Sequence, residues 1–161
     1  MDINSAVTAD NMANNSNGAQ LLTFFLDGQE YGVDILRVQE IRGWSEPMPI
    51  PNAPSYIKGV INIRGDVVPI ADLSQRIGVG TKAYGATTAV VVLRVQFKNR
   101  ERTMGVIVDA MSDVTSVPAE ALKPPPTFDS SDDELTKYIA TLDEKMITIL
   151  DVDHIFGGQG G

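Results

Sequence analysis

A pattern that occurs twice is the strongest constraint on how this chain folds. The segment GVDILRVQEI at residues 32–41 matches GVIVDAMSDV at 105–114, 73 positions later. The segment VVPIADL at 67–73 matches MITILDV at 146–152, 79 positions later. A Pro-rich loop lies between the two matched blocks in each half, and a longer second loop accounts for the larger offset. We interpret the pattern as a duplicated unit; the alternative is that two all-β halves look alike by composition.

Turn signals and apolar runs predict β-hairpins. Asp27-Gly28 joins two apolar runs, which is a strong hairpin signal, and Arg64-Gly65-Asp66 joins two more. The run AVVVLRVQF at 89–97 is rich in β-branched residues and predicts a largely buried strand. Ile35, Val38 and Ile41 lie three residues apart, which predicts one short helical turn. Short strands with frequent turns are typical of small β-barrels.

The repeat also predicts the domain organisation. Residues 1–19 are rich in Asn, Ser, Ala and Asp and are expected to form a disordered tail. Residues 20–157 are expected to form two barrel halves, 20–83 and 84–157, and the pattern leaves open whether strands are exchanged between them. Residues 158–161 are expected to be loose. A barrel of about 65 residues is marginal alone, so we expect the two to pack together with a groove at their junction.

Charge and composition exclude several kinds of partner. The net charge of −8 disfavours nucleic acid and anionic lipid, because both repel an acidic surface. The N-terminus lacks the basic and apolar regions of a signal peptide, and no apolar run is long enough to insert into a membrane. The absence of cysteine excludes disulfides and thiolate metal sites.

Catalytic chemistry has no evident residues in this chain. His154 is the only histidine, so neither a Ser-His-Asp triad nor a histidine-rich metal site is evident. The adjacent acids Asp132, Asp133 and Glu134 are best interpreted as solvated charges in a loop. We therefore expect no enzyme activity, no metal and no cofactor, and a function in binding.

Three motifs resemble the CheW family of bacterial chemotaxis coupling proteins. They are EYGVDILRVQEIRG at 30–43, IKGVINIRGDVVPIADL at 57–73, and GVIVDAMSDV with LKPPP after it. The resemblance runs from about Gln20 to Phe156, and the first two motifs are long and specific. The same fold occurs in the regulatory domain of the histidine kinase CheA and in CheV, but this chain has no room for a kinase or receiver domain.

The resemblance implies both a fold and a function. The fold is two SH3-like five-stranded β-barrels around a common core. The function is non-catalytic: the protein links the cytoplasmic tips of chemoreceptors to CheA and places kinase activity under receptor control. The expected partners are the CheA regulatory domain, the receptor tips and other CheW copies in array rings. The expected location is the cytoplasm, at membrane-bound arrays through those partners.

Motif matching then assigns individual residues. The receptor-binding positions that it implies are Val38, Glu40, Ile41, Arg64, Ala89, Val90, Gly105 and Met111. The positions that it implies for the kinase and ring interface are Lys123, Thr127 and Phe128. Two of these positions depart from the family pattern, because Ala89 replaces a larger residue and Thr127 replaces an acid.

Other interpretations of these residues and of the chain stay open. Val38, Ile41 and Val90 fit core positions equally well, and Glu40 with Arg64 fits a salt bridge whose loss would act through stability. A coupling protein of a chemosensory pathway other than chemotaxis is the main alternative function. An SH3-type peptide-binding module is less favoured, since it needs an aromatic-lined groove and aromatic residues make up only 6% of the chain.

Overall fold

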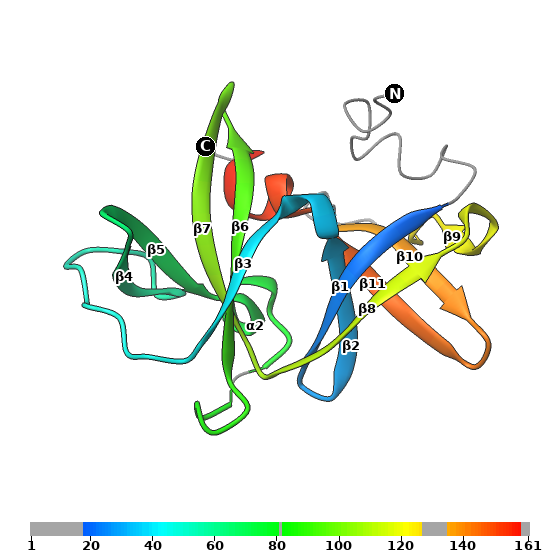
Figure 1. The fold of residues 1–161 in the computed structure, drawn as a ribbon, viewed down its shortest axis with the longest axis horizontal. Coiled ribbons are helices and arrows are strands. Elements are labelled where there is room, and N and C mark those ends of the chain that lie inside the picture. Colours follow the sequence, from blue (N-terminus) through cyan, green and yellow to red (C-terminus); the bar gives the residue numbers. More distant parts are fainter. Residues whose placement is uncertain (1–17, 81, 127–134, 159–161) are drawn as a thin grey trace.

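The computed structural model describes residues 18–80, 82–126 and 135–158, which form two curled β-sheets. Figure 1 shows the two sheets packed side by side. Sheet A has the strand order β8-β1-β2-β11-β10-β9 and sheet B the order β3-β6-β7-β5-β4. The strands of sheet A are β1 (Ala19–Leu26), β2 (Gln29–Asp34), β8 (Ala110–Val117), β9 (Leu122–Lys123), β10 (Thr136–Leu142) and β11 (Lys145–Leu150). Those of sheet B are β3 (Val38–Gly43), β4 (Ile57–Ile63), β5 (Asp66–Asp72), β6 (Ala89–Phe97) and β7 (Arg100–Val108).

The described helices are short. They are η2 (Ile35–Arg37), α2 (Leu73–Ile77), η3 (Ala119–Ala121) and η4 (His154–Gly158). None of them is long and apolar enough to cross a membrane. The predicted all-β class with a few short helices is confirmed.

Both predicted hairpins are present, and each turns over two residues. Leu26 pairs with Gln29, and the turn residues Asp27 and Gly28 have φ values of 51° and 79°. Ile63 pairs with Asp66, and Arg64 and Gly65 have φ values of 51° and 92°. Positive φ at both central residues is the type I′ geometry, which matches the twist of the flanking strands.

The helical turn predicted around residues 35–41 ends earlier than expected. Only Ile35–Arg37 is helical, and β3 begins at Val38. In β3, Val38 pairs with Leu93 and Glu40 with Val92, so Gln39 is an extra residue in a β-bulge. The bulge restores a common face to Val38 and Ile41, which explains why their three-residue spacing looked helical.

Each sheet combines strands from both sides of the proposed boundary at residues 83 and 84. Sheet A holds β1 and β2 with β8 to β11, while sheet B holds β3 to β5 with β6 and β7. We match β1, β2, β3, β4 and β5 in that order with β6, β7, β8, β10 and β11. With each strand replaced by its match, the order of sheet B becomes β8-β1-β2-β11-β10, which is the order of the long strands in sheet A. The parallel ladders agree with this, since Ile70 pairs with Gly105 and Ile149 with Gly32.

The repeat also reproduces individual hydrogen bonds. The side chain of Asp72 accepts from the backbone N–H of Gln75 at 3.1 Å, and that of Asp151 accepts from His154 N–H at the same distance. The N–H of Asp72 donates to Tyr56 O, and the N–H of Asp151 donates to Leu135 O. We propose on these grounds that the chain is a duplicated unit in which the two halves exchange strands.

Three apolar clusters form the core of the described residues. One lies within sheet A around Leu21 and Ile147, and one lies within sheet B around Val90 and Ile107. The third, here called the shared core, draws on both sheets, and its buried residues include Phe24 from β1, Val91 from β6, and Ile155 from η4. Burying one such side chain contributes about 1.5–3 kcal/mol, so separating the sheets would expose a large part of the stabilising surface.

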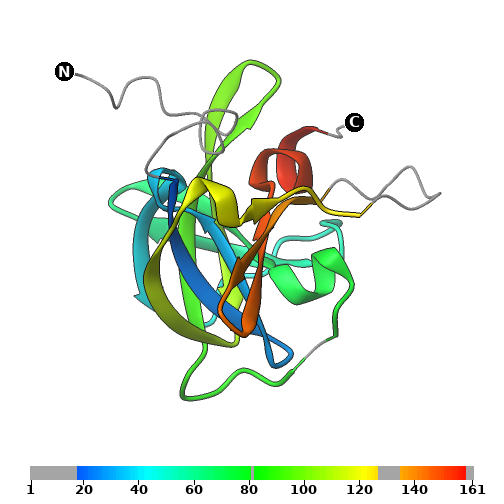
Figure 2. The same ribbon diagram turned by 90° about the vertical axis from the view of Figure 1, so that its right-hand side faces the viewer.

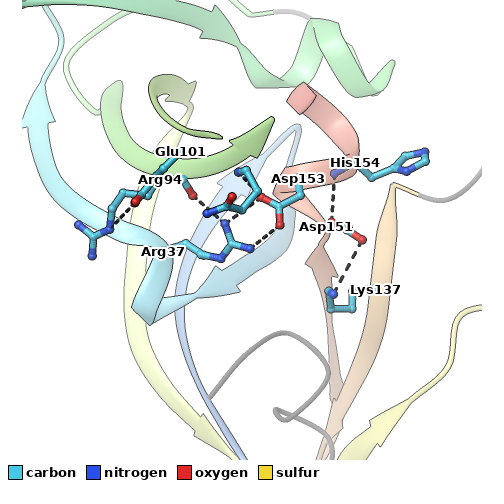
Figure 3. A network of polar contacts seen from close by, with 8 residues as sticks. Arg37, Arg94, Glu101, Lys137, Asp151, Asp153 and His154 are labelled. Carbon is cyan, nitrogen blue, oxygen red and sulfur yellow. Dashed lines mark hydrogen bonds and ion pairs between the residues drawn. The ribbon is translucent and has the colours of Figure 1, made fainter. Parts of the chain in front are cut away.

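The C-terminal segment is tied to sheet B by a polar network (Figure 3). Arg37 forms two hydrogen bonds with the carboxylate of Asp153 and donates a third to the carbonyl of Arg94 at 2.9 Å. Asp153 also accepts from the backbone N–H of Gln96 at 2.8 Å. The network fixes the η2 crossover, β6 and the start of η4 relative to one another.

Candidate functional site: an apolar strip on two edge strands

The edge strand β3 of sheet B presents apolar side chains toward the shared core. Val38 pairs with Leu93 and Ile41 pairs with Val91, and both partners belong to that core. Directly paired residues point to the same face of a sheet, so Val38 and Ile41 lie on the face that the sheets share. Val38 packs against the core, whereas 47% of Ile41 is exposed.

The edge strand β8 of sheet A repeats this arrangement. Met111 pairs with Phe24 and Val114 with Leu22, both in the shared core, and a register shift lies between the two pairs. Met111 is partly buried against the core, and 50% of Val114 is exposed. These residues lie 73 positions after Val38 and Ile41, so each strand has one half-buried and one exposed apolar side chain.

We call Val38, Ile41, Met111 and Val114 the apolar strip. Its strands β3 and β8 lie on the same side of the molecule in Figure 1 and in the turned view of Figure 2. Three of its members were predicted as receptor contacts, and Val114 was not. The 73-residue repeat could have identified Val114, because it is the equivalent of Ile41.

Glu40 and Arg64 form an ion pair, which the sequence analysis gave as the alternative to a direct receptor contact. Glu40 pairs with Val92 of the sheet B core and therefore lies on the opposite face of β3 from Ile41. Its carboxylate contacts Arg64 at the β4–β5 turn and Arg42 at 2.9 Å. Hydrogen bonds from Arg64, and to a smaller extent from Arg42, hold the pKa of Glu40 below its ordinary value. β3 and β4 are the two edge strands of sheet B. The Glu40–Arg64 pair therefore joins the edge strand β3 to the turn of the β4–β5 hairpin, which forms the opposite edge.

Three further predicted receptor positions are buried. Ala89 belongs to the shared core, and Val90 belongs to the core of sheet B. Gly105 is also buried, and a Cβ atom there would lie 2.6 Å from Ile70 Cδ1 and 3.0 Å from Val90 Cγ1. A substitution at Val90 or Gly105 would act on a partner through packing, because neither residue is open to contact in this structure.

Lys123 is the one predicted kinase position among the described residues, and it lies outside the strip. Lys123 is exposed on β9, which pairs with β10 in sheet A. Thr127 and Phe128 lie outside the described residues, as do the acids Asp132, Asp133 and Glu134. Within the described ranges, no group of three or more His, Cys, Asp or Glu side chains is arranged to hold a metal ion.

The fold and the strip define a class of protein built from two packed β-barrels, with exposed apolar residues beside their shared core. A family model described as the CheW-like domain matches residues 20–159. The chain is 37% identical to the chemotaxis protein CheW of Klebsiella aerogenes, over 94% of this chain and 90% of the relative. It is also 37% identical to the chemotaxis protein CheW of Rhizobium meliloti, over 88% and 90%.

A solved structure agrees with these sequence matches. The scaffolding protein TtCheW of Thermoanaerobacter tengcongensis superposes with a TM-score of 0.78 and 29% identity, covering 89% of this chain and 95% of that one. The chain belongs to the CheW-like family, and its two curled sheets are the SH3-like barrels that the resemblance implied.

Proposed function

We propose that this chain, a chemotaxis coupling protein by its family, links chemoreceptor tips to the histidine kinase CheA. Its relatives are named as chemotaxis proteins, and its structural neighbour is named as a scaffolding protein. These names favour chemotaxis over another chemosensory pathway. The proposed action is non-catalytic and cytoplasmic, at receptor arrays that the chain joins through its partners.

The observation that carries the receptor side of the proposal is the apolar strip. Ile41 and Val114 are half exposed at equivalent places on two edge strands, beside a buried core. An exposed apolar patch often marks a binding surface. A helical receptor tip presents apolar side chains at intervals of three and four residues, which suits a strip of this kind.

The predicted residues then divide by the way in which they would act. Val38, Ile41 and Met111 would contact the receptor, together with Val114. Glu40 and Arg64 would hold β3 in place and contact the receptor from the side. Ala89, Val90 and Gly105 would act through packing under β3. On the kinase side we propose Lys123, Thr127 and Phe128 for the contact with the CheA regulatory domain and with other CheW copies.

The test reconstitutes the chain with a receptor tip fragment and CheA. Kinase autophosphorylation is measured with and without the chain, and receptor binding is measured separately by calorimetry. The double variant Ile41→Asp/Val114→Asp places two charges on the strip at half-exposed positions, where they should not prevent folding. We expect receptor affinity to fall at least about 10-fold, because each lost apolar contact is worth about 1–2 kcal/mol.

A matched control comes from the same repeat. Val67 and Met146 are 68% and 67% exposed, lie 79 positions apart and are outside the strip. Val67→Asp/Met146→Asp introduces the same two charges outside the strip, so its receptor affinity should fall much less than that of the strip variant. Equal losses in the two variants would remove the strip from the proposal. A folded wild-type chain that binds neither the receptor fragment nor CheA would contradict the coupling function itself.

A further inference from the structure

The β6–β7 hairpin extends beyond the sheet that contains it. Pairing of β3 with β6 ends at Leu93, and pairing of β5 with β7 begins at Gly105. Between these points β6 and β7 pair only with each other within the described strands, up to Phe97 and Arg100. Figures 1 and 2 both show this hairpin projecting from the body of the molecule.

The projecting part carries the opposite charge to the rest of the chain. Residues 94–102 hold four cations and one acid, a net charge of +3, so the remainder of this −8 chain carries −11. Arg94 pairs with Glu101 at 3.5 Å. In the part of the chain that the structure describes, Lys98, Arg100 and Arg102 form no ion pair.

Two of these cations lie over the ring of Phe97. The guanidinium of Arg102 lies 4.8 Å from the centre of the Phe97 ring, and the ammonium of Lys98 lies 5.4 Å from it. Arg100 pairs directly with Phe97, so both side chains point to the same face of the hairpin. Arg102 pairs with Val95 on that same face, which therefore presents two arginines around one aromatic ring.

The base of the hairpin is fixed to the body of the protein. Arg94 donates to Leu36 O at 3.3 Å, and its own carbonyl accepts from Arg37. The N–H of Gln96 donates to Asp153. A hairpin backbone that is held at its base loses little conformational freedom on binding, which favours affinity.

Protection of a free strand edge does not account for this arrangement. Charged residues on an edge, lysine especially, discourage pairing with other chains. Acids outnumber bases by 21 to 13 in this chain, yet the tip is cationic. Edge protection needs no aromatic ring beside the charges, whereas Lys98 and Arg102 lie over the Phe97 ring while both remain exposed.

We propose that the tip of this hairpin, residues 97–102, docks an acidic segment of a partner protein. The planar forks of Arg100 and Arg102 match the two oxygens of a carboxylate, and the Phe97 ring supplies apolar contact beside them. A nucleic acid extends far beyond a tip of this size, and the −11 remainder of the chain would repel it. A short acidic segment can satisfy the tip without approaching that remainder.

The test uses the full chain and a fluorescein-labelled peptide of ten glutamates, with anisotropy measured at about 50 and about 150 mM salt, since screening should weaken binding at the higher salt. The variant Arg100→Gln/Arg102→Gln removes two tip cations. The control Lys58→Gln/Lys82→Gln removes two cations elsewhere and changes the net charge equally. Phe97→Ala keeps the charges but removes the ring. Circular dichroism and Tm confirm that each variant is folded.

We expect the wild type to bind the peptide, the arginine variant to bind about 10-fold more weakly and the control to stay within about 2-fold. Phe97→Ala should weaken binding several-fold, because the cations lose the surface that orders them. The proposal is overturned if the wild type does not bind at the lower salt, or if the control loses as much affinity as the arginine variant. Tighter binding of a 20-base-pair DNA than of the peptide would overturn the assignment to an acidic protein segment.

Discussion

Arg37 and Asp153 form a doubly hydrogen-bonded ion pair although 116 residues separate them. Arg37 lies in the crossover from sheet A to sheet B, and Asp153 precedes the η4 segment that packs into the shared core. The exposed fractions of their side chains are 23% and 31%. The pair therefore connects the crossover to the C-terminal segment. The crossover leads directly into Val38, the first residue of the apolar strip.

Breaking this pair should lower stability. Arg37→Gln and Asp153→Asn are each expected to reduce the free energy of unfolding by about 1–3 kcal/mol, because each leaves a half-buried charge without its partner. Urea unfolding followed by circular dichroism measures the change. The exposed Arg94–Glu101 pair is the control, and Glu101→Gln should cost less than about 0.5 kcal/mol. Equal costs for the two pairs would show that Arg37 and Asp153 have no special role.

Stability should also depend on the ionisation of Glu40. Contacts with Arg64 and Arg42 lower its pKa in the folded chain, so the ionised carboxylate stabilises the fold above its unfolded pKa. That stabilisation is lost as the pH falls through the folded pKa. Glu40→Gln should therefore be less stable than the wild type at neutral pH, and the difference should shrink as the pH falls below about 4.5.

Urea unfolding at a series of pH values measures this difference. The control is Glu120→Gln, because Glu120 is exposed and has no ion-pair partner among the described residues. A difference between Glu40→Gln and the wild type that stays constant with pH would mean that the glutamate acts through shape and not through charge.

The two equivalent glycines should respond differently to alanine. At Gly105 a new Cβ would lie 2.6 Å from Ile70 Cδ1, and Ile70 is itself buried. At Gly32 the nearest atoms lie 3.4 Å away, which is close to ordinary contact. Gly105→Ala should cost about 1–2 kcal/mol of unfolding free energy through overpacking, and Gly32→Ala less than half of that.

Adding Ile70→Val removes the Cδ1 atom and tests the cause. The loss from Gly105→Ala should then be smaller in the Ile70→Val background than in the wild type, as measured by thermal or urea unfolding. If the two losses are equal, the cost of Gly105→Ala arises from something other than the Ile70 contact.

Tyr84 should stabilise the connector between the α2 helix and β6. Its hydroxyl donates to Asp72 at 2.6 Å, and Asp72 is buried and also accepts from Gln75 at the start of α2. Burial is the main cause that raises the pKa of Tyr84, and the hydrogen bond to the Asp72 carboxylate raises it further. The hydroxyl therefore stays protonated. Tyr84→Phe should cost about 1–2 kcal/mol, since one buried carboxylate oxygen loses its donor.

Trp44 reports on this region. It is the only tryptophan, and its ring centre lies 4.4 Å from that of Tyr84. Tyr84→Phe keeps the ring, so the emission of the folded protein should change little while the unfolding midpoint falls. A large shift in native emission would indicate instead that the connector has moved.

The sequence by itself determined the local elements and the family. The turns at Asp27-Gly28 and within Arg64-Gly65-Asp66 were predicted because a type I′ turn needs residues that tolerate positive φ between two apolar runs, although Asp66 already belongs to β5. The repeated blocks led us to propose a duplication, and the pairing of Ile70 with Gly105 and of Ile149 with Gly32 supports that proposal. Patterns of this kind depend on neighbouring residues, so they can be read along the chain.

Only the tertiary structure decided which residues share a surface. Val90 and Ile41 were equally plausible as core or contact, and Val90 is buried while Ile41 is half exposed. The bulge in β3 and the pairing with β6 made that difference, since β6 is covered on both faces and β3 is an edge. The Arg37–Asp153 pair and the projecting cationic hairpin likewise depend on where distant strands end. Such contacts arise from strand order and register, which neighbouring residues do not specify.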